Sequence, residues 1–87
     1  MEREQKEESR ISVASIIVEA PESVVEINNI LHSFSSIIAG RLGLPYRERG
    51  ISVIALILDG TPDEISALTG KLGKVKSVSV KAVLSQK

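Results

Sequence analysis

The chain contains the same strand–helix–strand pattern twice, and this repeat restricts the fold more than any other feature. Ile11-Ser12-Val13 matches Ile51-Ser52-Val53, and Glu19-Ala20-Pro21-Glu22 matches Asp59-Gly60-Thr61-Pro62-Asp63 with one inserted residue. Two such units in tandem predict the order βαββαβ, with strand order 4-1-3-2 and both helices on one face of the sheet. The predicted fold class is α+β, a ferredoxin-like domain over residues 10–87 with a four-stranded antiparallel sheet.

Four short apolar segments supply the predicted strands. They run from Ile11 to Val18, from Ser36 to Arg41, from Ile51 to Leu58 and from Val78 to Leu84. Hydrophobic residues make up 43% of the chain but aromatic residues only 2%, so the core must be built from Ile, Val and Leu. β-Branched residues are common in strands, so this composition fits a domain rich in β-sheet.

Two helices are predicted between the strands. Pro21 suits the first helical position, and the segment from Val24 to Phe34 has apolar residues at the spacing of one helix face. The second helix should begin with a capping box, in which Thr61 and Glu64 each bond the other's backbone amide. We predict that Gly73 ends this helix as a left-handed cap.

Both central strands are apolar on both of their faces. In the third strand, one side carries Ile51, Val53, Ala55 and Ile57, and the other carries Ile54, Leu56 and Leu58. The segment from Ile11 to Val18 is similar. Two helices can cover only one face of the sheet, so the other face would present a broad apolar patch to water. We therefore expect a homo-oligomer, a dimer or a tetramer.

The segment from Gly40 to Gly50 is predicted to be a long, ordered connector that carries function. It holds three of the six glycines, one of the three prolines, the only tyrosine and three arginines. Guanidinium groups and exposed backbone amides suit a small anion such as a carboxylate, a phosphate or a nucleotide. The arginines could instead pair with Glu48, Glu19 or Asp59 across an oligomer interface. The candidate ligand-binding residues are Gly40, Arg41, Gly43, Tyr46, Arg47, Arg49 and Gly50.

Composition argues against several classes of function. The chain has 11 basic and 11 acidic side chains, so its zero net charge predicts neither direct DNA binding nor attraction to an anionic membrane. The absence of cysteine excludes disulfides and Cys-ligated metals. His32 is the only histidine and is expected at the surface or at an interface, so we expect neither a cofactor nor a metal held within one chain. A site shared between subunits across a symmetry axis is the alternative for His32.

The beginning of the chain is charged and shows no targeting signal. Residues 1–9 are mixed in sign and are predicted to form a flexible tail without the apolar segment of a signal peptide. No apolar run is long enough to span a bilayer. These observations predict a cytoplasmic location.

The string from Gly40 to Ile54, followed by Asp59-Gly60-Thr61 and by the segment from Ala67 to Gly73, resembles the family of proposed regulators of the iron-only hydrogenase system. The resemblance implies a ferredoxin-like domain similar to ACT domains and to the C-terminal domain of the nickel-responsive repressor. Two properties of that repressor do not carry over. Residues 1–9 are too short for its ribbon–helix–helix DNA-binding segment, and one histidine without cysteine cannot form its nickel site.

These features predict a non-enzymatic regulatory or sensory module that binds a small molecule or a partner protein at subunit junctions. The alternative is a structural oligomerisation module that has no ligand. An enzyme is not expected, because no nucleophile accompanies the carboxylates of Glu19 and Asp59. No aromatic stacking platform accompanies the lysines after residue 70, so they are predicted to form a solvated surface (Lys71, Lys74, Lys76 and Lys81).

Overall fold

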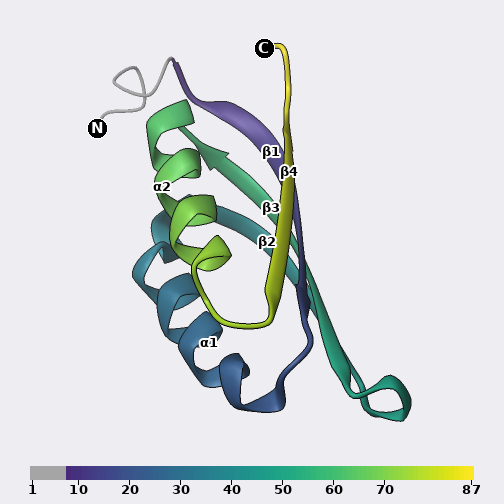
Figure 1. The fold of residues 1–87 in the computed structure, drawn as a ribbon. Helices are drawn as coiled ribbons and strands as arrows, with labels where there is room; N and C mark the ends of the chain where they lie inside the picture. Colours follow the sequence, from purple (N-terminus) through teal and green to yellow (C-terminus); the bar gives the residue numbers. More distant parts are fainter. Residues whose placement is uncertain (1–7) are drawn as a thin grey trace.

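The computed structural model describes residues 8–87, so most of the predicted tail over residues 1–9 lies outside the described residues. The sheet has the order β2-β3-β1-β4, and each pair of neighbouring strands is antiparallel. Together with the βαββαβ order of elements, this confirms the predicted ferredoxin-like fold and its strand order (Figure 1). The elements are β1 (Arg10–Val18), α1 (Val24–Ser33), β2 (Ile38–Tyr46), β3 (Ile51–Gly60), α2 (Pro62–Gly73) and β4 (Val78–Leu84), with 3-10 turns at Pro21–Ser23, Ser35–Ile37 and Arg47–Arg49.

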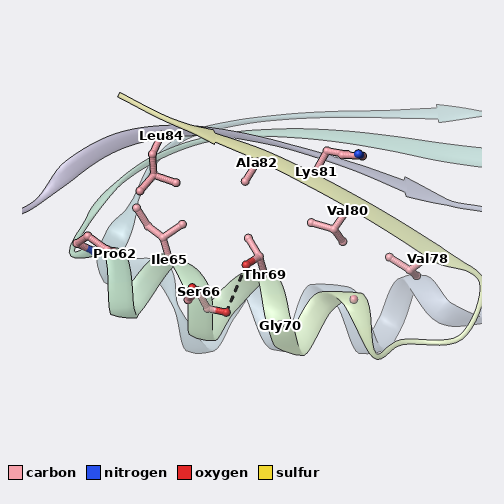
Figure 2. A pocket seen from close by; sticks show the side chains of 11 residues that line it. Pro62, Ile65, Ser66, Thr69, Gly70, Val78, Val80, Lys81, Ala82 and Leu84 are labelled. Atoms are coloured by element: carbon pink, nitrogen blue, oxygen red, sulfur yellow. Dashed lines mark hydrogen bonds between the residues drawn. The ribbon is translucent and has the colours of Figure 1, made fainter. Parts of the chain in front are cut away.

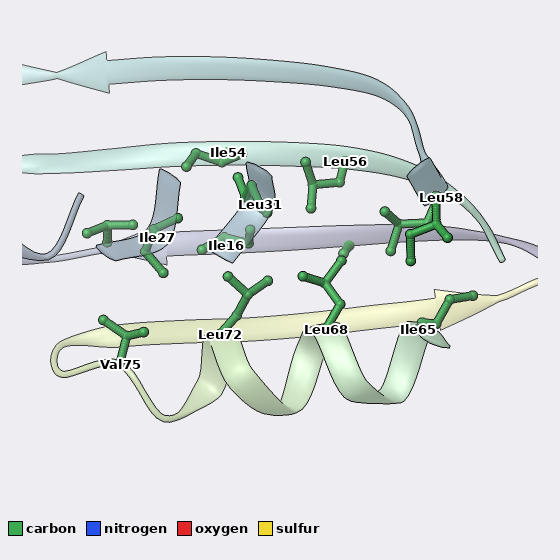
Figure 3. Close-up of a cluster of buried hydrophobic side chains, with 13 residues drawn as sticks. Ile16, Ile27, Leu31, Ile54, Leu56, Leu58, Ile65, Leu68, Leu72 and Val75 are labelled. Carbon is green, nitrogen blue, oxygen red and sulfur yellow. The ribbon is translucent and has the colours of Figure 1, made fainter. Parts of the chain in front are cut away.

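Both helices lie on the same face of the sheet, and α2 runs along the edge strand β4 (Figures 1 and 2). Alternate residues of β1 and β3 point toward the helices and are buried, as the period of two predicts. Figure 3 shows the resulting aliphatic core between the sheet and the helices. Its largest members are Ile16, Ile27, Leu31, Leu56, Leu58, Ile65, Leu68 and Leu72.

The beginning of α2 confirms one local prediction, and its end corrects another. The Glu64 amide donates to Thr61 Oγ1 at 3.1 Å, and the Thr61 amide donates to Glu64 Oε1 at 2.9 Å, which completes the capping box. Gly73, however, is helical, and the prediction of a left-handed cap there is wrong. Among residues 8–87 the positive φ angles fall at Gly50 and Ser77 instead. After Gly73 the chain continues far enough to bury Val75. The left-handed residue is Ser77, which lies directly before β4.

The prediction that the segment from Gly40 to Gly50 is a long connector between two strands is also wrong. β2 does not end at Arg41 but continues to Tyr46, which pairs with Ile51 of β3. Only the short turn Arg47–Arg49 and the left-handed Gly50 join the two strands. The even-numbered residues from Gly40 to Tyr46 direct their backbone groups toward β3, whereas Arg41, Gly43 and Pro45 direct theirs toward the outer edge of the sheet.

The residues expected to break the strand are accommodated at the edge of the sheet. A β-bulge separates Ile38 from Gly40, and a Cβ added at Gly40 would make only an ordinary contact of 3.7 Å with the Ile57 side chain. Bonding direction alternates along antiparallel strands. The Ser85 amide bonds the Ile11 carbonyl and the Glu19 amide bonds the Ser77 carbonyl, and the same alternation followed through β1 and β3 places the Pro45 nitrogen at the outer edge of β2. Its missing N–H therefore costs no bond to β3.

Candidate ligand site at the β2–β3 hairpin

The β2–β3 hairpin projects beyond the helices and forms one end of an elongated molecule (Figure 1). The principal dimensions are 44 × 20 × 18 Å. All residues from Arg41 to Gly50 are exposed, and Gly50 takes a φ of 69°, which favours glycine. The candidate residues of the sequence analysis therefore lie on an accessible but regular hairpin.

The pairing register divides these residues between the two faces of the sheet. Arg41 pairs with Leu56, Gly43 with Ile54 and Pro45 with Ser52. Directly paired residues share a face, so these three β2 residues belong to the helix side. Gly40, Leu42, Leu44 and Tyr46 belong to the opposite face, which neither α1 nor α2 covers.

A groove follows the helix side of β2 and separates it from α1. It consists of three hollows of ≈ 400, ≈ 210 and ≈ 330 Å³ that share wall residues from one to the next. The first two share Val24, Pro45 and Ser52, and the last two share Asn28 and Arg41. The hollows therefore follow one another along the α1–β2 edge, and we refer to them together as the α1–β2 groove.

Arginines lie at separate points along this groove. Arg47 lines the end near the hairpin turn, together with Tyr46 and Gly50. Arg41 lies further along, where its Nη2 donates a hydrogen bond of 2.6 Å to Asn28 Oδ1. Five residues of strand lie between the two arginines, so their Cα atoms are six residues and roughly 20 Å apart along the chain, and the two guanidinium groups do not converge on one small anion.

The structure brings together some of the predicted site residues and leaves others out. Arg41, Gly43, Tyr46, Arg47 and Gly50 line the groove, whereas Gly40 and Arg49 are not among its wall residues. The other walls of the first two hollows are mostly apolar or small, and the sequence analysis missed them (Val18, Pro21, Val24, Asn28, Leu44, Pro45, Ile51, Ser52 and Ile54). Val24 and Asn28 are four residues apart and so share one helix face, but no sequence pattern linked that face to β2.

The uncovered face of the sheet is broadly apolar, as the sequence predicted. All four strands contribute large side chains to it, and the exposed ones reach from 41% for Ile57 to 72% for Val83. We call this surface the free face and define it by its exposed large apolar residues: Ile11, Val13, Leu42, Leu44, Tyr46, Ile57 and Val83.

The other candidates do not form a second polar site within residues 8–87. His32 is exposed and lines the far end of the groove. In this part of the chain no three His, Cys, Asp or Glu side chains are grouped so that they could hold a metal ion. None of the helices in the same residues has the length and apolar character that crossing a membrane requires.

The architecture of the sheet and helices is that of an ACT-like domain. The ACT domain of the GTP pyrophosphokinase of Chlorobium tepidum superposes with a TM-score of 0.74 at 20% identity, covering 86% of this chain and 99% of that one. The C-terminal domain of the MgtC protein from Mycobacterium tuberculosis gives 0.66 at 17% identity and 92% coverage of both chains. At these identities the similarity shows the fold alone.

A family model described as "TM1266-like: Iron-only hydrogenase system regulator, putative" matches residues 10–82. The protein TM1266 from Thermotoga maritima is 38% identical, with a TM-score of 0.86 over 91% of this chain and 100% of that one. The chain therefore belongs to the TM1266-like family, which confirms the resemblance noted in the sequence. A comparison with curated proteins finds none that matches.

Proposed function

We propose that this chain is a non-enzymatic regulatory module that assembles through its free face and binds a small anionic molecule in the α1–β2 groove. The description of its family supports a regulatory role. The observation that carries the proposal is the arrangement of the hairpin. One side of β2 contributes Leu42, Leu44 and Tyr46 to the free face, and the other side forms a wall of the groove.

The free face supports assembly because soluble monomers rarely expose so many large apolar side chains on one side of a sheet. Four of its residues cluster on the outer half of the sheet, at β2 and β3: Leu42, Leu44, Tyr46 and Ile57. A second copy that covers this half would also come close to the hairpin turn. The groove would then lie beside a subunit junction, where ligand binding and assembly can influence each other.

The groove walls indicate the chemistry of the ligand. Val18, Val24, Pro45 and Ile51 offer apolar contacts at the end near the turn, and Arg47 supplies a positive charge there. Within residues 8–87, no side-chain hydrogen bond from Arg47 is found, whereas Arg41 is held by Asn28. A ligand with an apolar body and one carboxylate or phosphate would match this end of the groove.

Tyrosine fluorescence offers a direct test, because Tyr46 is the only tyrosine and the chain has no tryptophan. A panel of small carboxylates and phosphates is titrated while this emission is followed, and hits are confirmed by a rise in melting temperature. Arg47→Gln should weaken a true hit by about tenfold, since the charge-assisted bond is lost. Arg49→Gln is the matched control, because Arg49 is a neighbouring arginine that does not line the groove.

Two outcomes would count against the proposed ligand site. If no member of the panel changes the emission or the melting temperature while the protein remains an oligomer, the structural module without a ligand is the better description. If a hit responds equally to Arg47→Gln and to Arg49→Gln, the ligand binds elsewhere.

A further inference from the structure

The sheet has two edges, and they differ in how they are protected. At the β2 edge, Pro45 removes an outward N–H and a bulge interrupts the strand between Ile38 and Gly40. Both are common devices against unwanted strand pairing. β4 has neither a proline nor a bulge, and its seven residues from Val78 to Leu84 pair regularly with β1. Within residues 8–87, β4 is therefore the edge strand without these two interruptions, and its backbone is the better suited to pair with an added strand.

The hydrogen bonds at the two ends of β4 show which backbone groups are free. The Ser85 amide donates to the Ile11 carbonyl, and the Glu19 amide donates to the Ser77 carbonyl, both at 2.8 Å. Bonding direction alternates along an antiparallel strand, so odd-numbered residues of β4 face β1 and even-numbered residues face outward. The open edge thus presents the N–H and C=O groups of Val78, Val80, Ala82 and Leu84.

A groove lies beside this edge and is bounded on its other side by α2 (Figure 2). Its volume is ≈ 640 Å³. The α2 wall contains Ser66, Gly70 and Gly73, and a Cβ added at either glycine would meet nothing within 4 Å. The side chains of a strand paired with β4 would therefore find space above α2.

Charge indicates which kind of strand fits there. Residues 65–87, which form most of α2 and all of β4, contain five lysines and no acidic residue. The rest of the chain holds the other six basic residues and all eleven acidic ones, so the zero net charge hides a basic C-terminal segment. Lys81 stands on β4 itself, where it pairs with Ser15 on the free face.

This charge argues against a second copy of the chain as the occupant. Two β4 edges paired antiparallel along their full length would place the two Lys81 side chains opposite each other at the centre, and like charges directly opposite destabilise pairing. An edge lysine is also a common device against self-association. The same lysines would attract an acidic segment.

We infer that the β4 edge and the groove beside α2 bind an extended, acidic segment of a partner protein, which adds a fifth strand to the sheet. Its alternate side chains point into the groove over Gly70 and, on the other face, toward Lys81. Backbone bonds to the even-numbered residues of β4 provide affinity, and the groove and the lysine provide selectivity. This site is separate from the α1–β2 groove and does not depend on the function proposed for it.

The test uses an array of peptides of about seven residues in which Val, Ile or Thr alternates with Asp or Glu. A matched array replaces each acidic residue by Lys. Acidic members should bind, the lysine members should not, and amide chemical shifts should change along Val78–Leu84. An acidic array that binds no better than the lysine array would overturn the inference.

Two substitutions test where the peptide binds and are expected to leave the fold intact. Ala82→Pro deletes an outward N–H that makes no bond to β1, and Gly70→Leu fills the groove at a helical position with free space. Each should weaken the best peptide by about tenfold or more. Ala67→Leu is the control, because Ala67 is exposed on α2 but does not line the groove. Equal peptide binding by all three variants would refute the site.

Two further measurements exclude the other occupants. A single-stranded oligonucleotide that binds more tightly than the best peptide, and is unaffected by Ala82→Pro, would identify a nucleic-acid surface and refute the inference. A halved mass of the Ala82→Pro variant in sedimentation would identify an interface between copies, which also refutes it. We expect neither result.

Discussion

Ile57 is the residue at which the assembly argument can be tested most directly. It lies near the centre of the free face, paired with Val13 on β1 and with Gly40 on β2. Its side chain is 41% exposed in the single chain. We predict that Ile57→Asp leaves the fold of the single chain intact but strongly weakens its assembly.

The expected magnitude follows from the exposed side chains. Complete burial of an aliphatic side chain contributes about 1.5–3 kcal/mol, and roughly half of each free-face side chain is still exposed, so each can add about 1 kcal/mol. Seven such side chains per copy give a gross gain of about 14 kcal/mol for a dimer, against an association cost of about 4–15 kcal/mol. The margin is narrow, so assembly should be sensitive to one change at the centre.

Aspartate removes the contribution of Ile57 and buries a carboxylate that has no partner. The second effect costs at least a few kcal/mol per copy in an interface. Since both copies of a symmetric dimer carry the change, we estimate a loss of at least about 5 kcal/mol, or a dissociation constant raised about 1,000-fold or more.

Sedimentation equilibrium over a range of concentrations measures this effect, and circular dichroism monitors the fold. Val25→Asp is the matched control, because Val25 is 67% exposed on α1, away from the free face, and the charge change is identical. Ile54→Asp is the opposite control: Ile54 is 4% exposed on the helix side, so the fold itself should be lost. If Ile57→Asp keeps the wild-type mass at all concentrations, or if the wild type is a monomer throughout, the free face is not the interface.

Three further predictions concern stability and are checked by thermal and urea unfolding. Thr61→Ala should lower the free energy of unfolding by about 1 kcal/mol, because the Glu64 amide loses its acceptor, whereas Thr69→Ala on the same helix should have a smaller effect. Gly70→Ala should raise it by about 0.5–1 kcal/mol, because the added methyl meets no neighbour; a loss of stability would contradict the space found there. Ser12→Ala should also raise it, by about 1 kcal/mol, since the buried Ser12 hydroxyl has no hydrogen-bond partner within residues 8–87; a clear loss would reveal a partner.

The sequence predicted the fold well because its two periodicities are both strong. Alternating residues in β1 and β3 and the spaced aliphatic residues of α1 and α2 each specify a buried face, and together they permit one arrangement of layers. The capping box was predictable for a related reason, since both of its partners lie three residues apart at the start of α2. Such patterns specify a local structure without reference to the rest of the fold.

The hairpin was misread because its geometry depends on a neighbour. Proline and glycine argue against a strand when each residue is considered alone, but Pro45 is harmless where its nitrogen faces the open edge. Only the pairing register with β3 shows which edge that is. The wall of the groove was missed for the same reason, because Val24 and Asn28 become site residues only when α1 packs beside β2.

The free face and the α1–β2 groove meet at Tyr46, and this suggests how a ligand could control assembly. Tyr46 pairs with Ile51 on the free face and also lines the groove near Arg47. A ligand that orders this end of the hairpin would hold Tyr46 in the position that a second copy covers. Coupling of this kind is reciprocal, so if a ligand tightens assembly by some factor, assembly must tighten ligand binding by the same factor. Measuring ligand affinity for the wild type and for Ile57→Asp would therefore reveal the coupling, because a ligand indifferent to assembly would bind both equally.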